Sequence, residues 1–328
     1  LPWLIVVIII SALTSAALSL SVFVWLAPAF SPDIITTTLR LGAEREELDP
    51  TVANKVRQRI FRIYDKRDKL PGGFYRANTV RVQTAMFSSD GWAVAYVGDY
   101  KQGEERYWEG VDYQGRNFPV TRVVNDAVSG LAYVKFVGDG FPFFNFASFD
   151  DTLRGSIVWR FDGVWKSEKL DQVELSEGKQ FEINRQLMSF RLNSLAPSGI
   201  VITEKGELAG FADDKLHLIP VWFVEEQYAS ILQTGKTNYT GFPWRGFMVD
   251  GTVTDKIQRA SGFYISASGT KTSSSTVGIG DVIISIDGQS VRAEMLARQV
   301  LTAPDPARVT VIRQGKEIEV RVRKARID

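Results

Sequence analysis

Residues 88–94 read Ser88-Ser89-Asp90-Gly91-Trp92-Ala93-Val94, a turn signal followed directly by an apolar run. Asp-Gly pairs favour tight turns, whereas aromatic and β-branched residues favour strands. Similar turn signals recur along the chain at Tyr113-Gln114-Gly115, Gly138-Asp139-Gly140 and Glu204-Lys205-Gly206. Short strands separated by regular turns are typical of a barrel or sandwich, so the sequence predicts an all-β-dominated fold.

Helices are expected at the two ends of this β-rich stretch and within the last part of the chain. Asp49-Pro50 places an N-cap residue before a proline at the first helical position, and Val52, Val56 and Ile60 follow at spacing four. From Ile60 the pattern changes to the alternation of a strand. Further helices are predicted over residues 218–234 and 294–301, and further strands at 262–265, 309–313 and 317–322.

The first thirty residues read as a membrane anchor. Leu1 to Phe30 contain no charged residue. At about 1.5 Å per residue, a helix from Trp3 to Trp25 would extend roughly 33 Å, close to the hydrocarbon thickness of a bilayer. Ala27-Pro28-Ala29 resembles a small-x-small cleavage site, but the apolar run is too long for a signal peptide. We therefore predict a transmembrane helix over residues 1–30 and a juxtamembrane helical linker over residues 31–57.

Composition excludes several classes of function. The chain carries 39 Lys and Arg against 38 Asp and Glu, with both signs interspersed, which argues against a nucleic-acid partner. It has no cysteine, so disulfides, cysteine–metal sites and thiol catalysis are excluded. The pairs Asp150-Asp151 and Asp213-Asp214 lack spaced companions, so neither a metal site nor a cofactor is expected.

Several segments, in order, resemble the HtrA family of membrane-anchored or exported trypsin-like serine proteases that carry a PDZ domain. Residues 88–94 look like the strand before the family's catalytic histidine, and residues 196–199 with 204–210 look like its nucleophile region. The other similar segments are Tyr113–Pro119, Gly130–Lys135, Leu218–Pro220, Gly280–Ile283 with Asp287-Gly288, and Arg313–Lys316. The resemblance implies a trypsin-like double β-barrel over residues 58–236, a linker over 237–242 and a PDZ-like domain over 243–328.

The triad positions that the resemblance implies hold unsuitable residues. The histidine position falls on Gly98 and the aspartate position on Gly130. The nucleophile position falls on Pro197, or on Ser198 after a one-residue deletion. A serine hydroxyl is a poor nucleophile without an adjacent base, and proline has no backbone N–H for an oxyanion hole. The sequence therefore predicts an inactive protease, with Ser198 as the one open question.

Two other residues could serve as a base. His217 is the only histidine of the chain, and it stands beside the predicted closing helix, where we expect a surface or strand histidine. A Ser–Lys dyad of Ser198 and Lys205 would draw both groups from one hairpin-like segment.

The PDZ-like region is expected to remain competent without a triad. Such modules add an extended peptide to a sheet edge and hold its terminal carboxylate with backbone N–H groups. The resemblance assigns this groove to Trp244, Arg245, Gly246, Phe247, Met248 and Val249, with Leu296 and Val300 on the helix opposite. The alternative is a packing unit with a closed groove, which the polar stretch 269–276 in place of a short apolar helix would favour.

These features predict a single-pass membrane protein whose domains lie on the extracytoplasmic side. The expected role is a scaffold, an adaptor or a subunit of a membrane complex that binds protein partners, with peptide C-termini as the expected ligands of its PDZ-like domain. Ser11, Ser15 and Ser19 would line one face of the anchor, which favours self-association or contact with a partner helix. The alternatives are a divergent HtrA-type endopeptidase in extracytoplasmic protein quality control, and a sensor of protein C-termini.

Overall fold

A computed structural model describes residues 47–327, apart from residues 99, 150–155, 162, 175–179, 187, 193–198, 251–252, 255–256, 259–260 and 269–276. The predicted transmembrane helix, both candidate nucleophile positions and the polar stretch 269–276 lie outside the described residues. In the part of the chain that is described, no helix is both long and apolar enough to cross a bilayer.

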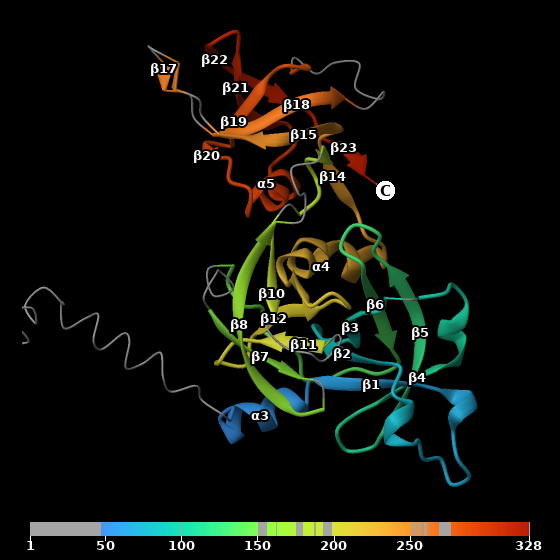
Figure 1. Ribbon diagram of the computed structural model, residues 1–328. Helices are drawn as coiled ribbons and strands as arrows, with labels where there is room; N and C mark the ends of the chain where they lie inside the picture. The colour runs from blue at the N-terminus through green and yellow to red at the C-terminus, as the bar shows by residue number, and fades with distance from the viewer. Residues whose placement is uncertain are drawn as a thin grey trace, which may run out of the picture. The chain divides into compact units, whose positions relative to one another are not determined.

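Six antiparallel strands close the first barrel, in the order β1-β2-β3-β6-β5-β4 (Figure 1). Its interior is aromatic: the rings of Phe61 and Phe136 stack with centroids 5.3 Å apart, and Phe141 meets Phe61 edge-on at 5.6 Å. The turn predicted at Asp90-Gly91 precedes β3, with Gly91 at φ +98°, a conformation that glycine adopts without strain. The strands are β1 (Ile60–Asp65), β2 (Val82–Met86), β3 (Trp92–Tyr96), β4 (Trp108–Val111), β5 (Asn117–Asn125) and β6 (Leu131–Phe136), with short 3₁₀ helices at Lys66–Asp68, Ala77–Thr79 and Glu104–Tyr107.

The second barrel is also closed by six antiparallel strands, in the order β10-β13-β12-β11-β7-β8. They are β7 (Ile157–Phe161), β8 (Trp165–Glu174), β10 (Met188–Leu192), β11 (Gly199–Ile202), β12 (Leu208–Ala212) and β13 (His217–Pro220). One buried cluster joins the two barrels, because Val94 and Tyr133 of the first belong to the same group as Ile200 and Phe211 of the second. The predicted all-β architecture is confirmed as a double barrel.

Two helices flank the barrels. Helix α3 (Pro50–Arg57) begins as predicted, with the Asp49 carboxylate accepting the N–H of Thr51 at 2.7 Å and that of Val52 at 3.3 Å. Helix α4 (Trp222–Thr234) starts later than predicted. Residues 218–220 are strand, because Leu218 and Pro220 pair with Ala212 and Gly210 of β12 and complete the barrel.

A second β-rich domain follows, with the sheet order β22-β21-β19-β18-β15-β9 and β20 beside β19. Its strands are β15 (Trp244–Val249), β18 (Gly262–Ser268), β19 (Val282–Ile286), β20 (Gln289–Ser290), β21 (Ala307–Arg313) and β22 (Lys316–Val322), with the separate pair β16 (Val253–Thr254) and β17 (Ile257–Gln258). Helix α5 (Leu296–Thr302) supplies Leu296 and Val300 to the core of this domain.

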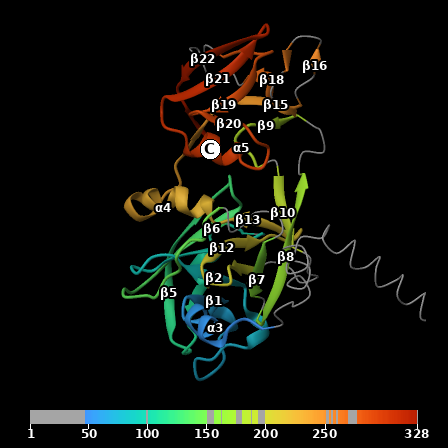
Figure 2. The ribbon, with the colours of Figure 1, turned by 90° about the vertical axis from the view of Figure 1, so that its left-hand side faces the viewer.

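The sheet of the second domain has one strand that the sequence did not predict. Strand β9 (Phe181–Glu182) comes from the connection between β8 and β10 of the second barrel, and it pairs with β15. Figure 2 shows β9 among the strands of the C-terminal domain. One end of this sheet is therefore built from the barrel part of the chain.

The segment predicted as a linker, residues 237–242, is ordered by pairing. Its strand β14 (Tyr239–Gly241) pairs with β23 (Ala325–Ile327) from the end of the chain. Tyr239 is buried, and its hydroxyl donates a hydrogen bond of 2.6 Å to Asp126 after β5. The connection is thus tied both to the C-terminal strand and to the first barrel.

Candidate functional site

A pocket lies where the two barrels meet and includes one of the predicted triad positions. Its volume is about 410 Å³, and it opens beside Gly98 at the end of β3. Strands β2 and β3 line it from the first barrel, and β11 and β12 from the second. The described lining residues are Val80, Arg81, Val82, Gln83, Tyr96, Val97, Gly98, Tyr100, Glu104, Trp108, Gly199, Phe211 and Asp214.

A tyrosine lies next to both glycines that the resemblance places at triad positions. A Cβ at position 98 would be 3.4 Å from the hydroxyl oxygen of Tyr96, and a Cβ at position 130 would be 4.0 Å from its ring. Tyr96 is the last residue of β3, two positions before Gly98, and its ring is half-buried. The structure therefore brings the two positions together, with an aromatic ring close to both.

Tyr96 is paired with an acid on the second barrel. Its hydroxyl donates a 3.2 Å hydrogen bond to Asp214 in the turn between β12 and β13. Burial raises the pKa of Tyr96, and the negative charge of Asp214 raises it further. Tyr96 is thus a neutral hydrogen-bond donor at neutral pH and does not act as a base.

Asp214 also occupies the space that a side chain at position 98 would need. A Cβ built on Gly98 would lie 2.8 Å from Asp214 Oδ2. That separation is shorter than normal contacts, so a histidine there would require the exposed Asp214 side chain to rotate away. The turn that carries Asp214 is held by Asp213, whose Oδ1 accepts the N–H groups of Lys215 at 2.8 Å and His217 at 2.7 Å.

The second predicted triad position, Gly130, lies beside the buried carboxylate of Asp126, which has a structural role. Gly130 has φ +75°, and its N–H donates to the carbonyl of Asp126 at 2.8 Å. The Asp126 carboxylate accepts from Val128 N–H, from the hydroxyl of Ser129 and from that of Tyr239. It fixes a turn and the connection to the second domain, and these bonds use both of its oxygens.

The remaining candidates for a base lie outside the pocket lining. Position 199, which follows Ser198, lines the pocket, whereas Pro197 and Ser198 themselves are outside the described residues. His217 is on β13, where its Nδ1 is 3.4 Å from Asp213 Oδ2. Lys205 is exposed in the turn between β11 and β12. Neither His217 nor Lys205 belongs to the described lining.

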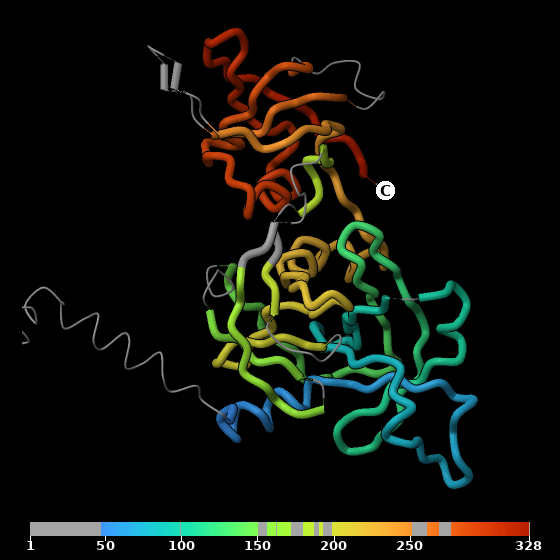
Figure 3. The backbone as a smooth tube through the Cα atoms, viewed as in Figure 1, coloured from blue at the N-terminus to red at the C-terminus, as the bar shows by residue number. Residues whose placement is uncertain are grey.

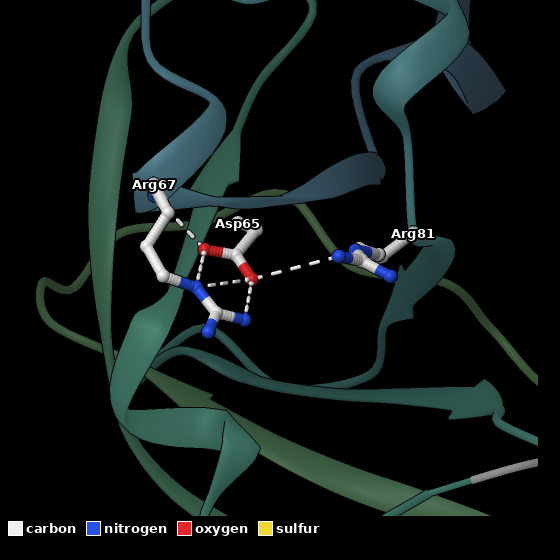
Figure 4. A network of polar contacts seen from close by, with 3 residues as sticks. All are labelled: Asp65, Arg67 and Arg81. Carbon is white, nitrogen blue, oxygen red and sulfur yellow. Dashed lines mark hydrogen bonds and ion pairs between the residues drawn. The ribbon is translucent and has the colours of Figure 1, made fainter.

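Arg81 of the pocket lining belongs to a charged network with Asp65 and Arg67 (Figure 4). The Arg67 guanidinium donates two hydrogen bonds to the buried carboxylate of Asp65, from Nε to Oδ1 at 2.9 Å and from Nη2 to Oδ2 at 2.5 Å. Arg81 Nη2 lies 3.6 Å from the same Oδ2. The hydrogen bond from Arg67 is the main cause that lowers the pKa of Asp65, so this carboxylate is ionised at neutral pH. Asp65 thereby balances the cation that Arg81 contributes to the pocket wall.

The residues predicted for a peptide groove fall into three sets by burial. Trp244, Gly246, Leu296 and Val300 are buried, with Trp244, Leu296 and Val300 in the core of the second domain. Arg245 is exposed, and Phe247 is exposed and stacks on Tyr264 with ring centroids 5.1 Å apart. Met248 and Val249 are half-buried at the far end of β15.

Three features of the site were missed in the sequence. Tyr96 could have been found, because strand alternation places its side chain on the same side of β3 as Gly98. No local sequence pattern indicated the roles of Asp214 and strand β9, because Asp214 meets Tyr96, and β9 meets β15, only through the tertiary fold. No group of three His, Asp or Glu side chains suited to a metal ion is found among the described residues.

Comparison with solved structures identifies the fold. An HtrA-type protease, AlgW, with a decapeptide superposes with a TM-score of 0.56 at 14% identity, covering 84% of this chain and 99% of that one. The same protease with a tripeptide gives a TM-score of 0.57 at 14% identity, covering 85% and 98%. A serine endoprotease from Yersinia pestis gives 0.47 at 13% identity, covering 86% and 100%.

The likeness to the two AlgW structures establishes the trypsin-like double barrel of HtrA-type proteases as the fold, and at 14% identity it shows nothing beyond the fold. No protein-family model matches the chain. No curated protein matches its sequence either.

Proposed function

We propose that this chain is an inactive relative of the HtrA-type proteases that binds extended peptides instead of cleaving them. The observation that supports this most directly is the pocket between the barrels. There Gly98 replaces the expected base, and the space around it contains the Tyr96–Asp214 pair.

The chemistry of that pair does not supply a triad. A general base must accept the proton of the nucleophile, and a neutral tyrosine that donates to a carboxylate has no such capacity. Gly130 offers no group to orient an imidazole, and Asp126 nearby is engaged by Val128, Ser129 and Tyr239. A hydroxyl at position 198 would thus lack the activation that acyl transfer requires.

Peptide binding is assigned to the second domain, in the manner of a PDZ domain. Strand β15 pairs with β18 along one side, with a bulge between Arg245 and Gly246. Its other side, where the short strand β9 pairs, is the edge that an added peptide strand would take, and Leu296 and Val300 of α5 belong to the same core. The AlgW structures with a decapeptide and a tripeptide make such binding a reasonable expectation for this fold. The proposal needs neither a metal nor a cofactor.

Membrane attachment belongs to the proposal on the strength of the sequence alone. Residues 1–30 would anchor the chain, and the domains would lie on the extracytoplasmic side, as a scaffold or as a subunit of a membrane complex. Self-association through the anchor is part of the same expectation.

A divergent serine endopeptidase is the second candidate, and one observation favours it. Asp214 lines the same pocket as Gly199, the residue that follows Ser198, so a carboxylate and a hydroxyl could meet there. Under this alternative Asp214 would take the place of the missing base.

A serine-hydrolase probe separates the two candidates. We expect a fluorophosphonate probe to leave the purified full-length chain unlabelled under conditions that label an active trypsin-like protease fully, because the described pocket lining offers no histidine to activate a serine hydroxyl. The Ser198→Ala variant gives the background. Labelling that disappears in Ser198→Ala and falls at least tenfold in Asp214→Asn would establish the endopeptidase and reject the inactive reading.

A further inference from the structure

The edge of β15 is already occupied by the chain itself. Strand β9 runs antiparallel to it, with Glu182 opposite Arg245 and Phe181 opposite Gly246, and the N–H of Ile183 donates to the carbonyl of Trp244 at 3.1 Å. In Figure 3 this stretch is the yellow-green length of tube among the orange strands of the C-terminal domain. An added strand is the form that a bound peptide would take at a sheet edge.

The side chains of this segment are also positioned as those of a ligand. Ile183 is completely buried in the core cluster that contains Leu296 and Val300 of α5. The ring of Phe181 meets Phe263 edge-on, with centroids 5.3 Å apart. Glu182, between them, is opposite exposed Arg245. Alternate side chains thus enter the domain, which is the pattern that gives strand addition its specificity.

The next residue, Asn184, takes the position where a peptide terminus would end. Its Oδ1 accepts the N–H of Phe242 at 2.9 Å, and its Nδ2 donates to the carbonyl of Phe242 at 2.7 Å. A carboxylate could reproduce the first of these bonds but not the second, because it has no proton to donate. The side-chain amide lets the chain continue past the groove while both backbone groups of Phe242 stay paired.

Gly241 makes this contact possible. A Cβ at position 241 would lie 2.2 Å from Asn184 Oδ1, so any other residue there would exclude the amide. At the opposite end of the segment, Gln180 Nε2 donates to Ser266 Oγ of β18 at 2.6 Å. The segment is therefore held at both ends as well as along its backbone.

We propose that residues 180–184 are a built-in ligand of the β15 edge, so that the groove is closed by the barrel part of the same chain until a competing strand displaces it. This inference rests on the proposed peptide-binding function, and it names the regulation of that site. A tethered segment acts at an effective concentration on the order of millimolar, so an outside peptide must be abundant or tightly bound to compete.

A cysteine pair tests the occupancy directly, since the chain has no cysteine of its own. Glu182→Cys with Arg245→Cys places the two thiols on directly opposed residues, whose Cα atoms in antiparallel strands are about 4.5–5.5 Å apart, within the range of a disulfide. Mild oxidation of the full-length protein should give a complete intramolecular crosslink. The control pair Glu182→Cys with Glu317→Cys, the latter on β22 at the other end of the sheet, should give none.

The affinity of the protein for an added peptide tests whether the built-in segment competes for the β15 edge. The probe is a fluorescein-labelled peptide with the sequence of residues 179–186, acetylated and amidated at its ends. Relative to the unaltered protein, Asn184→Ala should bind this probe about tenfold more tightly, because the built-in segment loses two hydrogen bonds. The oxidised Glu182→Cys/Arg245→Cys protein should lose binding at least tenfold and regain it on reduction. Lys169→Ala, an exposed change on β8 outside the segment, should bind as the unaltered protein does.

The outcomes separate the built-in ligand from the peptide-binding function. Absence of the Glu182–Arg245 crosslink, or a crosslink found only between two copies of the chain, would overturn the built-in ligand. Equal probe affinity for the unaltered protein and Asn184→Ala would overturn it as well. If the crosslink forms but neither Asn184→Ala nor the reduced double-cysteine protein binds any probe, the proposed peptide-binding function fails while the internal strand stands.

Discussion

At the scale of single residues, the structure gives Gly246 a role in strand packing. The resemblance placed this glycine in the expected peptide groove. In the structure it lies at the bulge between β15 and β18, where a Cβ would be 1.8 Å from the carbonyl oxygen of Tyr264. We expect Gly246→Ala to destabilise the protein by about 3 kcal/mol, measured by urea unfolding, because the strands would have to separate.

A matched glycine provides the control for that measurement. Gly278 has no atom within 4 Å of its Cβ position. Gly278→Ala should therefore change the free energy of unfolding by less than about 0.5 kcal/mol. Equal effects of the two substitutions would show that the close approach to Tyr264 is not what requires a glycine at position 246.

At the scale of elements, the hairpin of β7 and β8 contains a buried ion pair. Arg160 Nε lies 2.6 Å from Glu168 Oε1, and the two side chains are 0% and 3% exposed. Removing one partner of a buried pair leaves the other charge in a poorly solvating environment. Glu168→Ala should thus lower the free energy of unfolding by about 3–5 kcal/mol in urea titrations.

The neighbouring position serves as the comparison for this hairpin. Lys169 is exposed and pairs across the strands with exposed Ile157. Lys169→Ala should leave stability within about 0.5 kcal/mol of the unaltered protein. A loss in Glu168→Ala no larger than that in Lys169→Ala would mean that the ion pair contributes nothing to the second barrel.

At the scale of the whole molecule, buried tyrosines make the free energy of unfolding depend on pH in the alkaline range. Burial raises the pKa of Tyr133, Tyr239 and Tyr100, the last to about 12. An unfolded tyrosine loses its proton near pH 10, so above about pH 10 the unfolded chain binds fewer protons than the folded one. The stability from these groups is complete below pH 10, and the unfolding free energy should fall as the pH rises further.

Urea unfolding between pH 7 and 11 measures this dependence, and Tyr239→Phe tests its origin. Because Tyr239 donates to Asp126, the phenylalanine variant should be less stable at pH 7 by about 1.5–3 kcal/mol. Its loss of stability above pH 10 should be shallower than that of the unaltered protein. If the unfolding free energies of the two proteins fall equally steeply above pH 10, Tyr239 is not a source of the loss of stability at alkaline pH.

Local patterns in the sequence were sufficient for much of the architecture. Three predicted features depend only on neighbouring residues, and the structure has them where predicted. They are the turn at Asp90-Gly91, the Asp49 cap of α3 and the turn at Gln314-Gly315 between β21 and β22. The helix predicted over 218–234 was wrong in its first residues, since Leu218 and Pro220 are held as strand by the pairing with β12.

The sequence by itself determined the all-β character of the chain, because turn chemistry and side-chain alternation act over a few residues. The double barrel, and Gly98 and Gly130 as the positions of interest, came from the resemblance of short segments to the HtrA family. Only the tertiary structure decided what surrounds them. Tyr96 meets Asp214 across 118 positions of sequence, and Asn184 meets Phe242 across 58. Such contacts depend on how the strands are ordered and closed, which no local pattern records, and they decide whether the pocket and the β15 edge are open or occupied.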